Sequence, residues 1–369
     1  MKMLNLDIVP LKDWLPNAKR PLVISGPCGA ETEEQVMSTA RELAKLERVT
    51  IFRSGIWKPR TRPNSFEGVG SVGLTWLKKV KKDFGLLTTV EVANAQHVEE
   101  ALKHGVDILW IGARTTVNPF SVQEIADALK GVDVPVMVKN PLHPDIQLWI
   151  GALERINQAG IKKLVAIHRG FYTGVKTQYR NQPQWEIPIE LKSLFPQLPI
   201  ICDPSHICGR TDILQQVAQK ALDLDMAGLM IESHINPRSA LSDAKQQVAP
   251  EQLGELLGSL TVRSKDSKNP EFTDQLAQLR TLIDEIDEDL LEILAKRMEV
   301  IEKIGEYKRD NSVTILQLER WLEILRTRTA SGISKGMKKD FIEKICTLLH
   351  KESIRRQTEV MNEKKSTRY

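Results

Sequence analysis

The pattern of residues 199–234, PIICDPSHICGRTDILQQVAQKALDLDMAGLMIESH, predicts a strand, a helix and a second strand in succession. The first run, PIICDPSH, and the last, GLMIESH, are continuous apolar stretches, as expected for strands buried on both faces. The segment TDILQQVAQKALDL between them has the apolar spacing of an amphipathic helix. Two buried strands joined by a helical crossover indicate a parallel sheet covered by helices.

The same alternation extends toward the start of the chain, where helical stretches such as EEQVMSTARELAKL separate short apolar runs. The runs cover residues 21–28, 50–55, 85–92, 108–113, 134–139, 163–169, 199–206 and 228–234. Eight such runs favour a closed (β/α)8 barrel, a TIM barrel of the α/β class, over an open sheet.

A second, all-α region follows the last predicted strand. Residues 261–272, TVRSKDSKNPEF, are polar and contain Asn-Pro, which is typical of a linker. Apolar residues then repeat at helical spacing over 273–310, and further helical stretches cover roughly 314–329 and 337–362. We therefore predict a barrel domain over 1–262, a linker over 263–272, a helical domain over 273–362 and a solvated tail over 363–369.

Composition excludes several classes of protein. The 369 residues carry 52 Lys+Arg against 48 Asp+Glu, and this balance gives no reason to expect nucleic acid as a partner. An apolar content of 41% excludes wholesale disorder, and no apolar run approaches the ~20 residues of a membrane helix. Charged residues interrupt the start of the chain, unlike a signal peptide. The four cysteines lack CxxC spacing, so we expect free thiols in a cytoplasmic protein that contacts neither membrane nor nucleic acid.

Polar or reactive side chains stand at the carboxyl end of every predicted strand, where barrel enzymes carry their chemistry. These residues are Cys28, Arg53, Glu91, Arg114, Lys139, Arg169, His206 and Glu232. The cations among them, with Lys58, would repel each other around one mouth unless a strongly anionic ligand bound there. Arginine forks suit phosphate and carboxylate, so phosphorylated carboxylic acids fit, although any single arginine is equally compatible with a structural salt bridge.

A thiol, an imidazole and two carboxylates form a second group, namely Cys28, His206, Glu232 and Asp243. All four are ligands of divalent metals, and a mixed S/N/O set suits Mn, Fe, Co or Zn with open positions for a substrate oxygen. Such an ion would polarise a carbonyl for attack. For Cys28 alone, a buried and packed thiol is the alternative.

Motifs at nearly every strand resemble one family. They are GPC (26–28), FRSGIWKPRTRP (52–63), IGAR (111–114), DPSH (203–206), ESH (232–234) and LSDAKQ (241–246). Over about residues 15–260 the chain resembles the compact form of 3-deoxy-D-arabino-heptulosonate 7-phosphate synthase. The sister synthase that makes 3-deoxy-octulosonate 8-phosphate shares the barrel but lacks the KPRT stretch, and it remains the alternative for the barrel.

The resemblance implies condensation of phosphoenolpyruvate with erythrose 4-phosphate. The divalent metal would be held by Cys28, His206, Glu232 and Asp243. Phosphoenolpyruvate would be bound by Arg114, Lys139 and Arg169, with Arg53 assisting. Lys58 matches a candidate proton donor between the substrates, Arg60 and Thr61 match the erythrose 4-phosphate contacts, and Glu91 and Asp203 match supporting groups.

Two cations interrupt the apolar stripe of the long C-terminal helix. Arg297 and Lys308 are 11 residues apart, hence within ~20° of each other on the helix and ~16 Å apart along it. Two long side chains can lean toward one small ligand from that distance, whereas snorkelling at a helix edge is the alternative. Arg280 lies ~25 Å from Arg297 on the same helix and cannot reach the same molecule from its own chain. A helix ~57 Å long also exceeds a compact monomer of this size, so we predict a homodimer through the helical domain.

The segments LAQLRTLIDEIDEDLLEILAKR, GEYKR and HKESIRRQ resemble the all-helical chorismate mutase over about residues 273–360. The resemblance implies that chorismate is the substrate, with its carboxylates clamped by Arg297 and by Arg280 of the partner chain. Lys308 and Gln357 would donate to its ether oxygen, Ser353 shares a helix face with Gln357, and Glu319 matches a contact to the ring hydroxyl. Where the family usually has an aspartate, about four residues before this glutamate, the chain has Ile315.

These observations lead to the hypothesis of a bifunctional enzyme of aromatic amino acid biosynthesis. The alternative for the helical domain is a dimerisation or regulatory module without catalysis. Members of the synthase family often carry an N-terminal regulatory domain, and here about 20 residues precede the first predicted strand. We therefore expect the helical domain to be allosteric as well, sensing prephenate or chorismate and restraining the barrel.

Overall fold

The structure is a computed structural model that describes residues 5–58, 65–264 and 266–362. Its internal contacts divide the chain into two units, residues 1–265 and 266–369. Each unit is described by itself below. The predicted tail over 363–369 lies outside the described residues.

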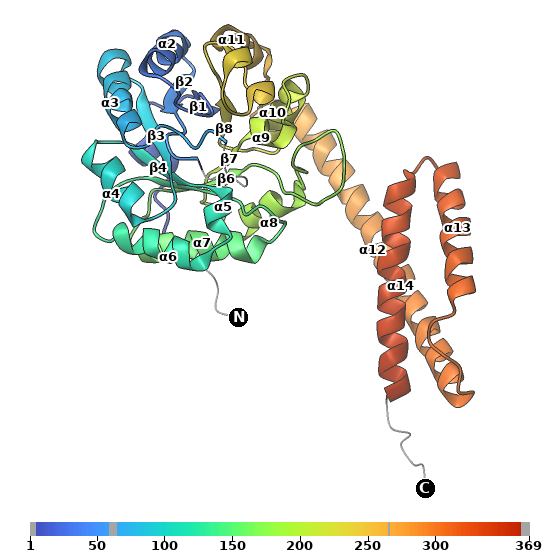
Figure 1. Ribbon diagram of the computed structural model, residues 1–369. Coiled ribbons are helices and arrows are strands. Elements are labelled where there is room, and N and C mark those ends of the chain that lie inside the picture. Colours follow the sequence, from blue (N-terminus) through green and yellow to red (C-terminus); the bar gives the residue numbers. More distant parts are fainter. Residues whose placement is uncertain (1–4, 59–64, 265, 363–369) are drawn as a thin grey trace. The chain divides into compact units, whose positions relative to one another are not determined.

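The first unit is a closed barrel of eight parallel strands that follow one another in chain order (Figure 1), which confirms the (β/α)8 prediction. The strands are β1 (Leu22–Gly26), β2 (Val49–Arg53), β3 (Leu87–Val92), β4 (Ile108–Ile111), β5 (Val136–Lys139), β6 (Leu164–His168), β7 (Ile200–Cys202) and β8 (Gly228–Glu232). They are shorter than the apolar runs, because the last residues of several runs belong to the loops that form the barrel mouth.

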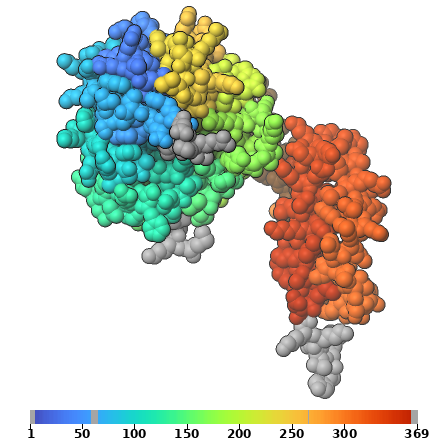
Figure 2. Space-filling model, viewed as in Figure 1, coloured from blue at the N-terminus to red at the C-terminus, as the bar shows by residue number. Residues whose placement is uncertain are grey.

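Helices surround the strands and connect them in sequence. They are α1 (Leu11–Trp14), α2 (Glu33–Ala44), α3 (Val72–Phe84), α4 (Ala95–Lys103), α5 (Ala113–Thr116), α6 (Pro119–Ala128), α7 (Ile146–Gln158), α8 (Glu186–Leu194), α9 (Pro204–Cys208), α10 (Leu214–Asp223) and α11 (Pro250–Ser259). On the face shown in Figure 2, these helices and their loops form a continuous surface over the strands.

Alternating residues of each strand serve two different cores. Val23, Phe52 and Leu109 belong to the larger core between strands and helices, whereas Ile24 and Ile51 belong to a smaller cluster inside the barrel. Both faces are therefore apolar, which explains the continuous runs in the sequence. The interior cluster ends at Leu15, which packs with Leu11 and Trp14 of α1 at the amino-terminal end of the barrel.

The second unit consists of three helices, α12 (Pro270–Asp310), α13 (Leu318–Ser334) and α14 (Lys339–Asn362). The helix α14 packs against both α12 and α13, and Gly305 allows close approach because a Cβ there would lie 3.3 Å from Gln357 Cα. Within this unit, the first half of α12 extends beyond α13 and α14 (Figure 1). Its apolar residues are exposed, including Leu279, Ile283 and Ile286 at 61%, 55% and 52%.

The start of α12 lies three residues before the predicted helix, within the segment predicted as a linker. Asn269 caps it by accepting hydrogen bonds from the backbone N–H groups of Glu271 and Phe272, and Pro270 occupies the first helical position. None of the described helices combines the length and apolarity required to cross a membrane.

Candidate active sites

Side-chain alternation points polar groups from five strands into the barrel mouth. Ile51, Met137, Ile167, Ile201 and Met230 all lie inside the barrel. The residue two positions further along points to the same side, and these residues are Arg53, Lys139, Arg169, Asp203 and Glu232. Each of them is at most 7% exposed, so the mouth has a floor of buried charges.

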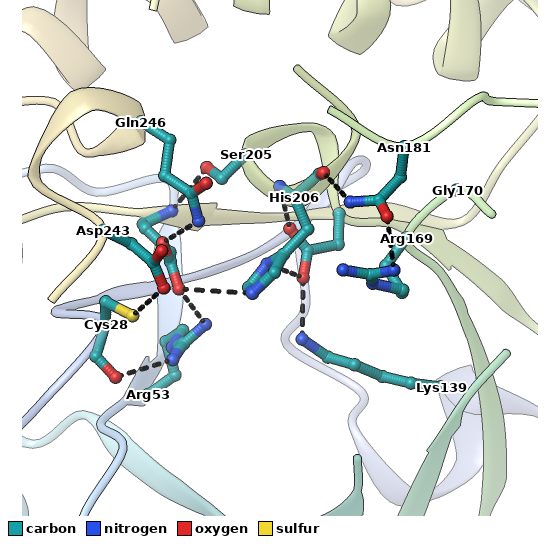
Figure 3. Close-up of polar contacts among 12 residues, drawn as sticks. Cys28, Arg53, Lys139, Arg169, Gly170, Asn181, Ser205, His206, Asp243 and Gln246 are labelled. Carbon is teal, nitrogen blue, oxygen red and sulfur yellow. Dashed lines mark hydrogen bonds and ion pairs between the residues drawn. The ribbon is translucent and has the colours of Figure 1, made fainter. Parts of the chain in front are cut away.

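The four predicted metal ligands meet at one side of this mouth, where Figure 3 labels Cys28, His206 and Asp243. Cys28 Sγ lies 3.2 Å from Asp243 Oδ2, and His206 Nε2 lies 3.8 Å from Glu232 Oε1. Asp243 has a φ of +50°, a conformation that Asp tolerates better than most residues. Within the described part of the chain, no three His, Cys, Asp or Glu side chains form a group that could hold a metal ion in its present arrangement.

A basic side chain contacts each of the three acidic groups of this set. The pairs are Lys58 Nζ with Cys28 Sγ at 2.9 Å, Arg53 Nη1 with Glu232 Oε1 at 3.0 Å and Arg180 Nη1 with Asp243 Oδ1 at 2.9 Å. Burial and the charge of Glu232 raise the pKa of Cys28 to about 12, although Lys58 opposes this shift. Burial also opposes ionisation of Asp243, but Arg180 and His206 hold its pKa well below the usual range. The set therefore combines a protonated thiol with ionised carboxylates.

Asp203 connects the metal side of the mouth to its cationic side. Its Oδ2 lies 2.8 Å from both Lys139 Nζ and His206 Nδ1. Burial opposes ionisation of Asp203, but His206 and Lys139 lower its pKa well below the usual value. Burial likewise lowers the pKa of His206, which favours a neutral imidazole. With its proton on Nδ1 facing Asp203, the ring presents Nε2 as an electron-pair donor.

The remaining predicted residues occupy different positions. Lys58 Nζ also donates to the backbone oxygen of Cys28 at 2.6 Å, and Glu91 Oε2 accepts from Trp110 Nε1 at 3.1 Å. Arg114 is exposed, and its charge helps to lower the pKa of Arg169. The predicted erythrose 4-phosphate contacts, Arg60 and Thr61, lie outside the described residues.

Three residues outside the strands and α-helices complete the site and were missed by sequence reasoning. Arg180 contacts Asp243 as described above and donates to Gln246 Oε1 at 2.6 Å. Gln246 Nε2 donates to Glu232 Oε2 at 2.7 Å, and Gln247 Oε1 accepts from the backbone N–H of Cys28 at 2.9 Å. Gln246 is the last residue of the motif that contains Asp243 and Gln247 directly follows it, which is a usable signal, whereas no strand end or motif marks Arg180.

The helical unit contains a separate cavity of about 830 Å³ between α12, α13 and α14. Four predicted residues line it, namely Arg297, Lys308, Ser353 and Gln357. Arg297 Nη1 donates to Ser353 Oγ at 2.9 Å, and Lys308 Nζ donates to the backbone oxygen of Ile315 at 2.6 Å. Gln357 Oε1 is buried and has no hydrogen-bond partner among the described residues. Since the described lining includes further basic residues but neither Asp nor Glu, the cavity suits an anion.

Two predicted mutase residues lie away from this cavity. Glu319 is exposed and does not line it, whereas Gln317 and Arg320, on either side of Glu319, do. Sequence reasoning missed Gln317 and Arg320, because the resemblance pointed to the glutamate between them. Arg280 is exposed on the first half of α12 and does not line the cavity of its own chain.

Comparisons with known proteins agree with the division into two units. The model of the DAHP synthetase I family matches residues 15–266, and the model of chorismate mutase type II matches residues 279–358. A phospho-2-dehydro-3-deoxyheptonate aldolase of Thermotoga maritima is 32% identical over 235 residues, covering 64% of this chain and 67% of that protein. A 2-dehydro-3-deoxyphosphooctonate aldolase of Paraburkholderia xenovorans is 26% identical over 282 residues, covering 71% and 97%.

Solved structures also resemble the barrel. A crystal structure of phospho-2-dehydro-3-deoxyheptonate aldolase (DAHP synthase) from Thermotoga maritima matches with a TM-score of 0.59 and 27% identity, covering 69% of this chain and 76% of that one. A truncated form of 3-deoxy-D-arabino-heptulosonate 7-phosphate synthase from the same organism matches with a TM-score of 0.56 and 25% identity, covering 67% and 92%.

Proposed function

Because the chain belongs to the DAHP synthetase I family over residues 15–266, we propose that its barrel condenses phosphoenolpyruvate with erythrose 4-phosphate. The observation that carries this proposal is the barrel mouth, where buried cations face a thiol–imidazole–carboxylate set across Asp203. This arrangement suits two phosphorylated substrates, one of which also offers a carbonyl to be polarised. Joining them into a seven-carbon sugar acid that keeps one phosphate consumes one water molecule and releases the other phosphate as inorganic phosphate.

The chain is a bifunctional enzyme, in which a transferase of the DAHP synthase type precedes an isomerase of the chorismate mutase type II. Both domains have roles in aromatic biosynthesis. The roles of individual residues and the substrates follow as proposals.

In the proposed synthase site, the cations bind and orient the substrates. Arg169 and Lys139 would hold the phosphate and carboxylate of phosphoenolpyruvate, with Arg114 at the rim and Arg53 assisting. Lys58 would deliver a proton to the oxygen of the aldehyde as the carbon–carbon bond forms, because its ammonium lies beside the thiol of Cys28. Holding two anions at reacting distance replaces a bimolecular encounter with a reaction inside one complex.

We propose that a divalent metal, one of Mn, Fe, Co or Zn, binds Cys28, His206, Glu232 and Asp243. The donor set supports this, since it combines sulfur, a neutral imidazole and two ionised carboxylates in contact. When bound, the ion supplies the positive charge that polarises the aldehyde. The high pKa of Cys28 implies that metal binding must displace the proton of the thiol.

The test is consumption of phosphoenolpyruvate with erythrose 4-phosphate, with and without a chelator, for the wild type and Cys28→Ala. We expect activity that a chelator abolishes and that a divalent ion restores in the wild type only. Activity that persists without metal would reject the ligand assignment.

The octulosonate synthase reaction is the second candidate for the barrel. The relative from Paraburkholderia xenovorans favours it, because 97% of that protein aligns with this chain. Comparing arabinose 5-phosphate with erythrose 4-phosphate as the acceptor decides between the two. We expect erythrose 4-phosphate to be preferred, since KPRT occupies residues 58–61.

For the helical domain we propose the rearrangement of chorismate to prephenate. Its cavity supports a dianionic ligand, with Arg297 as a carboxylate clamp and Lys308 and Gln357 as donors to the ether oxygen. Preorganised charges suffice for such a reaction, in which negative charge develops without a covalent intermediate. Lys308→Ala should abolish chorismate turnover while the oligomeric state stays unchanged. Equal turnover in the variant would reject the role of Lys308, and a wild type that does not turn over chorismate would favour a non-catalytic module.

We propose a homodimer in which the exposed half of α12 packs against a second copy. The apolar residues of that half support this, since they lack cover within their own unit. Arg280 of each chain would then reach the cavity of its partner. We also propose a cytoplasmic enzyme.

Regulation by the helical domain completes the proposal. A domain with its own anionic ligand, joined to the synthase barrel, can sense prephenate or chorismate and restrain the barrel. Deleting residues 263–369 should remove inhibition of the barrel reaction by prephenate. Unchanged inhibition in the deletion variant would contradict this role.

A further inference from the structure

The buried cations at the barrel mouth differ in how they are neutralised. Two of them contact carboxylates, Arg53 with Glu232 at 3.0 Å and Lys139 with Asp203 at 2.8 Å. Arg169 is 7% exposed and forms no ion pair with any carboxylate of the described residues. Its Nη1 instead donates to the neutral side chain of Asn181, at 3.0 Å from Oδ1. Arg169 is therefore buried, and no carboxylate of the described residues neutralises its charge by direct contact.

The orientation of the Asn181 amide follows from its two ends. Asn181 is 5% exposed, and its Nδ2 donates to the backbone oxygen of His206 at 2.6 Å (Figure 3). A carbonyl can only accept, so Nδ2 must face His206, and Oδ1 must face the guanidinium of Arg169. One amide thus connects the anion-binding side of the mouth to helix α9, which carries a proposed metal ligand.

The backbone around Arg169 is also held by a neutral amide. Asn140 Oδ1 accepts from the backbone N–H of Arg169 at 2.7 Å, and Asn140 Nδ2 donates to the oxygen of Gly170 at 2.9 Å. Gly170 has a φ of +74°, and a Cβ there would lie 2.9 Å from the backbone oxygen of Asn181. The close approach of these two segments fixes Asn181 against Arg169.

We propose that Asn181 is a positioning residue that orients Arg169 without neutralising it, so that the charge of Arg169 stays available for a substrate anion. This inference rests on the proposed function of the barrel. A carboxylate in the same place would form a charge-assisted pair with the guanidinium and compete with the substrate. The electrostatics agree, because burial, together with Arg180 and Arg114, lowers the pKa of Arg169 to about 10 despite the charge of Asp203. An incoming anion relieves this shortage of negative charge.

The test compares two substitutions that differ in charge. Asn181→Asp keeps the size of the side chain and the acceptor oxygen but adds a negative charge. Asn181→Ala removes both hydrogen bonds and adds no charge. We expect KM for phosphoenolpyruvate to rise at least about tenfold in Asn181→Asp, and by less in Asn181→Ala. In both variants, KM for erythrose 4-phosphate should change less than KM for phosphoenolpyruvate. A purely structural role predicts the reverse order, since alanine loses more contacts, and that order or an unchanged KM in Asn181→Asp would overturn the proposal.

A binding measurement and a matched control separate this proposal from the function of the barrel. Calorimetric titration with inorganic phosphate should show weaker binding to Asn181→Asp than to the wild type, whether or not the enzyme turns over, and equal binding would overturn the proposal. A wild type that binds phosphate but does not consume phosphoenolpyruvate rejects the proposed function alone. Asn157→Asp is the control, because the amide of Asn157 also makes hydrogen bonds at both ends but lies away from the mouth. Its Oδ1 accepts from the backbone N–H of Asp7, and its Nδ2 donates to the backbone oxygens of Asp7 and Ile161.

Discussion

At the scale of single residues, Asp203 holds the two halves of the synthase site together. One carboxylate oxygen lies 2.8 Å from both Lys139 Nζ and His206 Nδ1, and the other accepts from the backbone N–H of His206 at 3.1 Å. The side chain therefore orients Lys139, a proposed substrate-binding cation, and His206, a proposed metal ligand, at once. Histidine ligands commonly depend on such a partner for their tautomer and basicity.

Asp203→Asn should weaken both functions of the site. We expect metal affinity to fall roughly 10- to 100-fold, because the imidazole of His206 loses its anionic partner. The measurement is a competition titration with a metal-binding dye. Asp212→Asn, an exposed aspartate paired with Arg210, is the control and should bind metal as the wild type does. Equal affinity in Asp203→Asn would contradict a role in orienting His206.

His168 should make folding stability depend on pH. Its ring is fully buried near Trp185, and burial, aided by the charge of Arg169, lowers its pKa to about 3. An unfolded histidine titrates near 6.5, so below that pH the unfolded chain binds a proton that the folded chain does not. Stability should then fall by up to about 1.4 kcal/mol per pH unit between pH 6.5 and 3, with no contribution above pH 6.5.

Urea unfolding of the barrel at pH 7.5, 6.0 and 5.0 measures this contribution. In His168→Gln, the decline between pH 6.5 and 5 should be shallower than in the wild type, because glutamine does not titrate. His143→Gln, at an exposed position, should leave the wild-type decline unchanged. Parallel declines in all three proteins would show that His168 is not the group responsible.

Sequence reasoning located the charged floor of the barrel mouth but not the contacts that organise it. Arg53, Lys139 and Arg169 could be predicted because strand alternation and the rule of barrel ends place them. Arg180 and Asn181 could not, because they come from a long loop whose path depends on tertiary contacts. The polar contact between Arg180 and Asp243, for instance, joins residues 63 positions apart.

At the scale of elements, α12 changes its surroundings along its length. Its second half carries Arg297 and Lys308 on the wall of the cavity, whereas its first half leaves an apolar stripe exposed. A helix of 41 residues with half of its apolar face exposed is expected to be covered in the assembled protein. The second half of this continuous helix therefore lines the cavity, whereas the first half offers an apolar surface for packing.

Ile286→Glu should dissociate the proposed dimer and reduce chorismate turnover, while the barrel reaction continues. A buried, unpaired carboxylate at each copy of the interface costs several kcal/mol, about enough to separate the chains. Sedimentation velocity over a range of concentrations measures the change. Glu288→Lys, two residues along and on the opposite face, is the control and should remain dimeric. A dimeric Ile286→Glu protein would place the interface elsewhere.

The existence of the elements was predictable, but several of their ends were not. Seven strands lie within the apolar runs and β2 begins one residue before its run, yet β7 ends at Cys202 rather than at residue 206. Asp203 accepts from the backbone N–H of His206 and starts helix α9 there, so a cap competes with the strand. Similarly, α13 extends to Ser334, because Gly332 packs against Ile342 instead of ending the helix.

At the scale of the whole molecule, the two sites use different residues in different units. The barrel mouth lies within residues 1–265, and the helical cavity lies within residues 266–369. No lining residue is shared among those that the structure describes. The basal reactions should therefore be separable even where one domain regulates the other.

Reciprocal inactivation tests this separation. Arg169→Ala should reduce the consumption of phosphoenolpyruvate at least about 100-fold and leave chorismate turnover within about twofold. Arg297→Ala should do the opposite. Both activities are measured on the same preparations without added prephenate. Loss of both activities in either variant, with an unchanged melting temperature, would contradict independent basal sites.

Leu11, Trp14 and Leu15 close the amino-terminal end of the barrel, which has a practical consequence for protein engineering. Leu15 belongs to the same interior cluster as Leu22 and Ile24, and α1 packs beside it. A shortened chain that starts at residue 19 would open this end of the barrel to water and expose an apolar surface prone to aggregation. Minimal versions of the synthase domain should therefore keep Leu11, Trp14 and Leu15. In the full chain, affinity tags or fluorescent fusions are better attached at the carboxyl end, after α14.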